Sequence, residues 1–223
     1  MKIGIFGHSD ALYRESRYMK TPASILAAAF PDDQIDWFGV GFCSSERLLL
    51  TLQKHKNYDL YFLFHTNHTK VYCPAWNKDA RAIDLRKCLI NADFKEKFIK
   101  TLERTGNDSS LMNEFNFDKE LLDNKILMNR WVGALLQIRG FCIDKKTIHI
   151  YSDQVKINIL SEFYHSNQIS NYLKEHRKSK EKAELSAEGF YHILSHTHRE
   201  SHYERFSALL CNEINKFKEL SSQ

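Results

Sequence analysis

The chain has 223 residues, of which 43% are hydrophobic and 27% are charged, and its formal net charge is +4. This hydrophobic share can fill a core and excludes a wholly disordered chain, while eight glycines and three prolines exclude collagen-like and low-complexity classes. The positive surplus is too small to favour nucleic acid as a partner. The length fits one domain.

Targeting signals and cysteine spacing bear on the compartment. The apolar run at residues 3–7 is far shorter than the core of a signal peptide, and no window reaches the ~20 apolar residues of a membrane span. The five cysteines are widely spaced without a Cys-x-x-Cys pair, which disfavours a disulfide framework or a zinc ribbon. We therefore expect a cytoplasmic protein with reduced thiols and no membrane partner.

Strands and helices alternate in the first part of the chain. Apolar runs bounded by turn residues predict strands at 3–7, 34–40 and 59–64, and helices at 23–30 and 45–55. Short connections between alternating elements favour a parallel sheet with right-handed crossovers.

The second part of the chain is less regular at first and then helical. A helical period runs through 79–104, and a long amphipathic helix is expected at 118–139, ended by Gly140. The remaining predicted elements are a strand at 147–151 and helices at 158–184 and 203–220. The fold class is therefore α/β: a single three-layer α/β/α domain over residues 1–223, with a helical insertion near 75–118.

Candidate catalytic residues follow three of the predicted strands. Ser9 follows the first strand, and two histidines, His196 and His198, precede the last predicted helix. Because the carboxyl ends of parallel strands share one edge, the serine can meet a histidine base there, as nucleophilic acyl transfer requires. The N–H of Gly41 and the amide of Asn67, after the second and third strands, can complete an oxyanion site.

Further polar side chains gather at the same predicted edge, and we expect them to line the pocket. They are His8, Asp10, His65, His68 and His202. The histidine clusters also allow a second, weaker interpretation, in which the protein is a metal-dependent phosphoester hydrolase. The metal ligands would then be His65, His68, His196 and His198. No cofactor is expected for the serine mechanism.

The first of these blocks resembles that of the SGNH (GDSL-type) hydrolases, whose fold is a flavodoxin-like α/β/α sandwich. Residues 5–9 (IFGHS) are similar to the family's apolar strand followed by Gly-Asp-Ser. The resemblance implies that Ser9 is the nucleophile and that its own N–H is one oxyanion donor. The glycine that ends the second strand in the family corresponds to Gly41.

The later blocks extend the resemblance. Residues 59–68 (DLYFLFHTNH) resemble the block that supplies the family's side-chain donor, which implies that role for Asn67. Residues 196–202 (HTHRESH) resemble the run that carries the base, which implies His196, with His198 as the alternative. The chain is also similar to SGNH-like proteins encoded by bacteriophages.

Three departures from the family pattern affect the expected function. His8 replaces an aspartate, His65 replaces a glycine, and no carboxylate stands three residues before either candidate base. We expect a serine ester hydrolase acting on a small-molecule or glycan ester. The alternative is a catalytically impaired SGNH-like protein used for binding, for instance a phage accessory protein.

Overall fold

The computed structural model describes residues 1–7, 20–39, 43–66, 70–71, 83–84, 93, 95–96, 99–100, 103, 124–151, 158–186 and 194–221. Within residues 70–71, 83–84, 124–126, 177–186 and 194–200 it describes the backbone alone.

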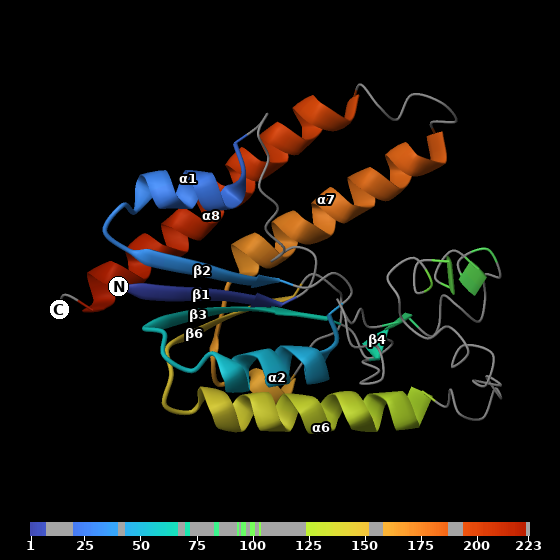
Figure 1. Ribbon diagram of the computed structural model, residues 1–223, viewed down its shortest axis with the longest axis horizontal. Coiled ribbons are helices and arrows are strands. Elements are labelled where there is room, and N and C mark those ends of the chain that lie inside the picture. The colour runs from blue at the N-terminus through green and yellow to red at the C-terminus, as the bar shows by residue number, and fades with distance from the viewer. Residues whose placement is uncertain are drawn as a thin grey trace.

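Five strands of the described part form one sheet in which every neighbouring pair is parallel (Figure 1). In sheet order they are β2 (Gln34–Gly39), β1 (Lys2–Gly7), β3 (Leu60–His65), β6 (Thr147–Tyr151) and β7 (Tyr164–His165). By position in the chain the order is 2-1-3-4-5, which is consistent with a flavodoxin-like α/β fold. The predicted α/β class and parallel sheet are confirmed.

Helices cover both faces of this sheet (Figure 1). On one face lie α1 (Pro22–Ala29), α7 (Asn167–Ser186) and α8 (Leu194–Ser221). On the other lie α2 (Ser45–Lys54) and α6 (Asn124–Cys142). Three short elements complete the described structure: the antiparallel pair β4 (Lys70–Val71) and β5 (Ile83–Asp84), and a 3-10 turn, η2 (Asn158–Leu160).

Alternating side chains of the central strands divide the core into two clusters. In β3, Phe62 and Phe64 face α1, α7 and α8, whereas Tyr61 and Leu63 face α2 and α6. These four side chains are at most 1% exposed. Burial on both faces explains why the strand reads as a continuous apolar run in the sequence.

Capping residues fix where the first two helices begin. Thr21 caps α1 in a capping box with Ser24, and Pro22 takes the first helical position. Ser44 caps α2, since its side chain accepts a hydrogen bond from the N–H of Arg47. The apolar stripe of α2, which includes Leu52, then packs onto the sheet.

Helix α8 runs antiparallel to the strands across one face. Near its C-terminal end, Lys218 forms a 2.5 Å ion pair with Asp33, which directly precedes β2. Farther back along the helix, the ring of Phe206 contacts that of Phe64 near the carboxyl end of β3. The N-terminal turns of α8 therefore extend beyond the carboxyl edge of the sheet (Figure 1).

Four predicted elements differ from the structure. Within the helical stretch predicted at 79–104, residues 83–84 form the strand β5. The long helix continues through Gly140 to Cys142 instead of ending at the glycine. The helix predicted at 158–184 is replaced by η2, β7 and α7, so that one strand was missed. The last helix begins at Leu194, not at 203. The insertion predicted near 75–118 lies largely outside the described residues.

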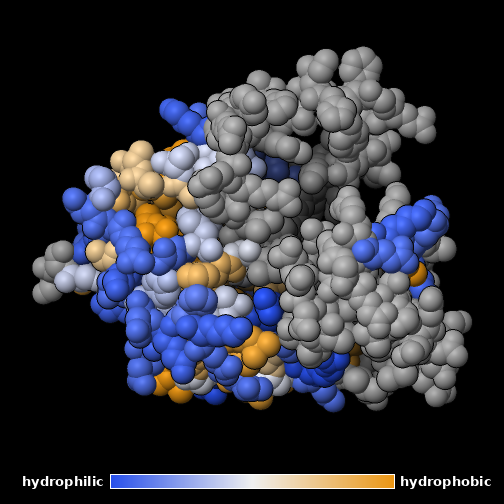
Figure 2. All heavy atoms as spheres, in the orientation of Figure 1, coloured by the Kyte–Doolittle hydropathy of each residue, from blue (hydrophilic) through white to orange (hydrophobic). Residues whose placement is uncertain are grey.

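On the face that Figure 2 shows, the described surface is mostly hydrophilic, with apolar side chains in separate patches. The large hydrophobic residues exposed in the described part are Leu50, Leu136, Ile143, Tyr164 and Leu220. Among the described helices, none combines the length and the apolar character that a membrane crossing needs.

Candidate functional site

The sheet order reverses between β1 and β3, and their carboxyl ends lie side by side. Gly7, the last residue of β1, pairs with Phe64 of β3. Gly7 has a φ of +142°, and a Cβ at this position would lie 2.5 Å from the carbonyl oxygen of Phe64. Glycine therefore permits both the backbone conformation and the close approach to β3. In doubly wound sheets, ligands bind outside the carboxyl ends at such a reversal.

The described strands end close to the predicted site residues. The first strand ends two residues before Ser9, and β2 ends at Gly39, two residues before Gly41. The third strand ends at His65, two residues before Asn67. The predicted site residues that lie outside the described part are His8, Ser9, Asp10, Gly41, Asn67 and His68. Their roles stay predictions.

The three C-terminal histidines of the predicted site all lie on α8 and not before it. The helix rises about 1.5 Å per residue, so His196 and His198 lie about 12–15 Å along the axis from Phe206. Only their backbone is described. His202 lies about 6 Å along the axis from Phe206 and is thus the nearest of the three to the level of β3.

The imidazole of His202 is held by a tyrosine of α7. The hydroxyl of Tyr172 lies 2.7 Å from Nδ1 of His202 and donates to the backbone carbonyl of the same residue at 3.2 Å. A phenol has one proton, so when that proton bonds to the carbonyl, the phenol oxygen must accept from Nδ1–H. This arrangement leaves the lone pair on Nε2, which is the form a general base needs.

Rings and a cation surround this pair. The imidazole of His176 stacks on that of His202 with centroids 3.7 Å apart and an interplanar angle of 10°. Phe206 stacks on the His202 ring at 5.9 Å, and the Arg205 guanidinium lies 5.1 Å above the Tyr172 ring. Burial raises the pKa of Tyr172, which Arg205 partly opposes, so the phenol keeps its proton at neutral pH.

Helix α6 holds the end of β3 from the opposite face of the sheet. The indole N–H of Trp131 donates to the carbonyl oxygen of Thr66 at 3.0 Å, and both residues are buried. This hydrogen bond holds the backbone of Thr66, the residue directly before Asn67, which is the predicted oxyanion donor.

His65 lies at the end of β3 with its ring turned toward the α6 side. It is 1% exposed, and its Nε2 lies 2.8 Å from Nδ1 of His149 on β6. Nε2 of His149 in turn lies 3.0 Å from Oγ1 of Thr147. The two imidazoles are nearly parallel, and the His65 ring also stacks on Tyr151. His65 therefore has a defined partner in the core.

Burial keeps His149 uncharged. Removal from water, followed by the nearby His165 ring, lowers the pKa of His149 to about 3. Burial also raises the pKa of the Cys142 thiol to about 12, so it stays protonated. A neutral imidazole carries one N–H, so His149 donates either toward His65 or toward Thr147.

Sequence reasoning missed Tyr172, His176 and His149. The first two lie on a helix predicted from its charged stretch, and nothing in that pattern indicates which side chains face His202. His149 interrupts an apolar strand (TIHIY), and a histidine flanked by two isoleucines was a usable signal for a buried polar contact.

The described residues contain no group of three or more histidine, cysteine, aspartate or glutamate side chains arranged to hold a metal ion. Searches of protein-family models, of curated proteins and of solved structures found no match to this chain.

Proposed function

We propose that this chain is an SGNH-type serine ester hydrolase. Ser9 attacks the ester carbonyl, a histidine of α8 takes its proton, and the N–H groups of Ser9 and Gly41 with the Asn67 amide bind the oxyanion. The bond to the alcohol then breaks, the histidine gives its proton to that alcohol, and water releases the acyl group from Ser9 by the same steps. The three-layer sandwich with a helical insertion near 75–118 belongs to this proposal.

The observation that carries the proposal is the position of the His202 imidazole relative to the end of β1. A chain of contacts leads from Gly7 through Phe64 and Phe206 to His202. Gly7 lies two residues before Ser9. An imidazole held near this strand end fits the base of a serine nucleophile.

This geometry adds His202 to His196 and His198 as a candidate base and favours it over them. In the dyad that we propose, Tyr172 takes the place of the orienting carboxylate that the sequence lacks. A neutral acceptor stabilises an imidazolium less than a carboxylate does, so a modest turnover is expected.

Two assays test the proposal. A fluorophosphonate probe should label the wild type and not Ser9→Ala, because it reacts only with an activated serine. Turnover of p-nitrophenyl acetate should fall at least about a thousandfold in Ser9→Ala, and stay unchanged in Ser161→Ala, an exposed serine near η2. Undiminished labelling and turnover in Ser9→Ala would refute the serine mechanism.

The base is identified by three single variants. His202→Ala should lower turnover at least about a hundredfold, the size expected for a general base, and by more than His196→Ala or His198→Ala. Gln137→Ala, an exposed residue of α6 on the opposite face of the sheet, is the control. A larger loss in His196→Ala or His198→Ala moves the base to that residue.

A further inference from the structure

The stacked imidazoles of His176 and His202 join α7 to α8 beyond the apolar contacts that hold the two helices to the core. Of the described side chains, Leu173 is the last buried one along α7, and Phe206 is the first buried one along α8. His176 and His202 lie about one turn nearer to the ends at which the helices are connected, and both are partly buried. Because few buried contacts hold these turns, they can open without unfolding of the core.

The geometry of the stack makes it sensitive to protons. The two rings are nearly parallel, and their centroids lie 3.7 Å apart. One imidazolium on the face of a neutral ring is attracted by the π-electrons of that ring. Two imidazoliums at this separation repel each other, so the second proton binds more weakly than the first and favours separation of the rings.

The described groups that contact the stack supply no negative charge to offset a second proton. The Tyr172 hydroxyl lies 2.7 Å from Nδ1 of His202, and burial raises the pKa of this phenol, so it is neutral at and below neutral pH. The Tyr203 ring lies 5.8 Å from that of His202. The Arg205 guanidinium, above the Tyr172 ring, adds a positive charge.

The remaining described charges of these turns lie at other positions around the helices. Lys174, Glu175 and Glu204 stand one or two residues from a ring of the stack, a spacing at which side chains of one helix do not face each other. Helix α1, which packs on α8, has no titratable side chain. The titratable side chains of β3 and β6 lie on the opposite face of the sheet.

We propose that the His176–His202 stack is a pH-sensitive latch, which holds the outer turns of α7 and α8 together at neutral pH and releases them when both rings are protonated. The latch uses neither Ser9 nor an ester. Its consequence for catalysis rests on the proposed function: release would withdraw a candidate base from the carboxyl edge of the sheet at acid pH.

NMR titration of the imidazole C–H resonances tests the coupling of the two rings. The spectra are recorded from about pH 8 to about pH 4.5, a range that spans the usual titration of histidine. His176 and His202 should take up their protons in two steps whose midpoints differ by at least about one pH unit, because interacting groups titrate as a pair.

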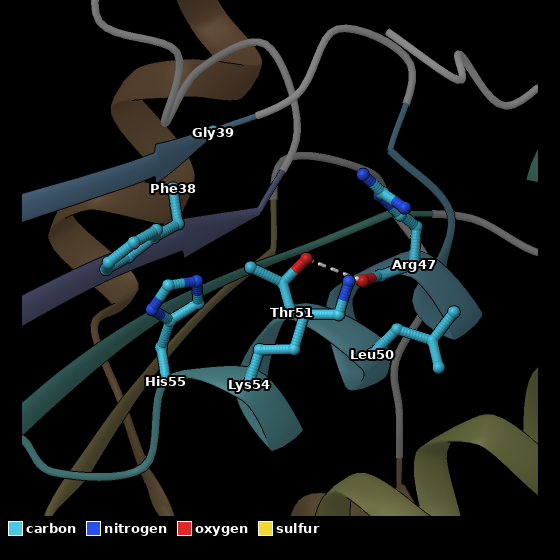
Figure 3. Close-up of a pocket in the computed structure, with 7 residues that line it drawn as sticks. All are labelled: Phe38, Gly39, Arg47, Leu50, Thr51, Lys54 and His55. Carbon is cyan, nitrogen blue, oxygen red and sulfur yellow. Dashed lines mark hydrogen bonds between the residues drawn. The ribbon is translucent and has the colours of Figure 1, made fainter. Parts of the chain in front are cut away.

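His55 is the internal reference for this titration. It lines a small pocket between β2 and α2 with Phe38, Arg47 and Lys54 (Figure 3). Its ring lies 4.1 Å from that of Phe38, which takes up no proton. His55 should therefore titrate in a single step, although it too contacts another ring.

Amide hydrogen exchange measures the release itself. Between about pH 7.5 and about pH 5, protection factors at residues 173–176 and 201–205 should fall at least about tenfold in the wild type. In His176→Phe, which keeps a flat ring but takes up no proton, the fall should be less than about twofold. His55→Phe makes the same change at the reference histidine and should keep the wild-type fall.

The amides of α6 are followed in the same experiment, because the effect of His149 on global stability reaches all elements, whereas release of the latch is local. Circular dichroism and thermal midpoints verify that each variant is folded.

Three results would overturn the proposal: titration of His176 and His202 in one step like that of His55, the same loss of protection in His176→Phe as in the wild type, or an equal loss in α6. None of these measurements depends on ester hydrolysis, so failure of the latch and failure of the serine mechanism are told apart.

Discussion

Nε2 of His65 lies 2.8 Å from Nδ1 of His149, and this contact joins two neighbouring strands inside the core. The residues are 84 positions apart in the chain and come together because β3 and β6 pair in parallel register. Both side chains are at most 1% exposed. Because this imidazole pair is buried, the stability of the protein depends on pH below neutrality.

His149 should make the free energy of unfolding decrease as the pH is lowered below 6.5. The folded protein holds the pKa of His149 at about 3, whereas the unfolded chain returns it to its usual 6.5. Between these values only the unfolded state takes up the proton, so the free energy of unfolding decreases as the pH falls through this window. At pH 4.5 the effect of His149 alone should lower the free energy of unfolding by on the order of 2–3 kcal/mol relative to neutral pH.

A double variant, His65→Leu with His149→Leu, isolates this contribution. It removes both partners and leaves no unpaired imidazole, so its stability should depend less on pH between 6.5 and 4.5. Urea unfolding followed by circular dichroism at several pH values measures the slope. Identical slopes in the wild type and the double variant would contradict the assignment to His149.

Gly7→Ala should destabilise the protein by about 2 kcal/mol or more, because alanine disfavours a φ of +142° and its Cβ would meet the Phe64 carbonyl. Gly133→Ala is the matched control. Gly133 lies inside α6 with open space around the position of a Cβ, so alanine should stabilise the helix by about 0.5–1 kcal/mol. Thermal unfolding of both variants should show shifts of opposite sign.

Glu213→Ala should cost on the order of 3 kcal/mol. This carboxylate of α8 is 2% exposed and accepts hydrogen bonds from Ser166 at 2.6 Å and from Tyr164 at 2.9 Å, so its removal leaves the buried Ser166 hydroxyl without this acceptor. Glu219 is an exposed glutamate on the same helix, and Glu219→Ala should change the free energy of unfolding, measured in urea, by less than about 0.5 kcal/mol. Equal effects of the two changes would show that the contacts of Glu213 contribute nothing.

Tyr172→Phe tests the orientation of His202 and rests on the proposed hydrolase activity. The variant keeps the ring but removes the oxygen that accepts from Nδ1–H, so kcat should fall about tenfold with little change in KM. Loss of this acceptor also destabilises the imidazolium, so the acid limb of the pH–rate profile should move to lower pH. Tyr203→Phe, beside the same imidazole, should leave the profile unchanged.

The central strands could be predicted from the sequence because they are buried on both faces. Residues 3–7 and 59–64 read as continuous apolar runs, and β1 and β3 begin and end within one residue of these bounds. Helix starts likewise have local signals, such as Thr21 before Pro22. The cap of α2 was predicted at Ser45, and the structure places it one residue earlier, at Ser44.

Other features depend on packing that no local pattern records. Gly140 does not end α6, since its position is open and the next turn gains the buried Cys142 and a contact between Phe141 and Tyr61. The early turns of α8 are polar on every side. The sequence before Tyr203 therefore lacks the apolar period from which a helix could be predicted. The predicted bases therefore lie on a helix instead of in a loop.

The partner of His202 was beyond sequence reasoning for the same reason. Tyr172 and His202 come from different helices 30 residues apart, and only the packing of α7 on α8 brings them together. The pocket between β2 and α2 could have been suspected from the spacing of Arg47 and Lys54 on one helical stripe. Its aromatic wall depends on the stacking of Phe38 and His55 across two elements.

The brevity of β7, which is one of the two edge strands of the described sheet, limits association with other chains at that edge. An outermost strand normally offers a row of free amide and carbonyl groups on which a second polypeptide can extend the sheet, the first step of many aggregates. Here that row is two residues long, Tyr164 and His165. An incoming segment would gain almost no backbone hydrogen bonds there, so this margin of the fold resists fibril growth without needing charged or proline gatekeepers.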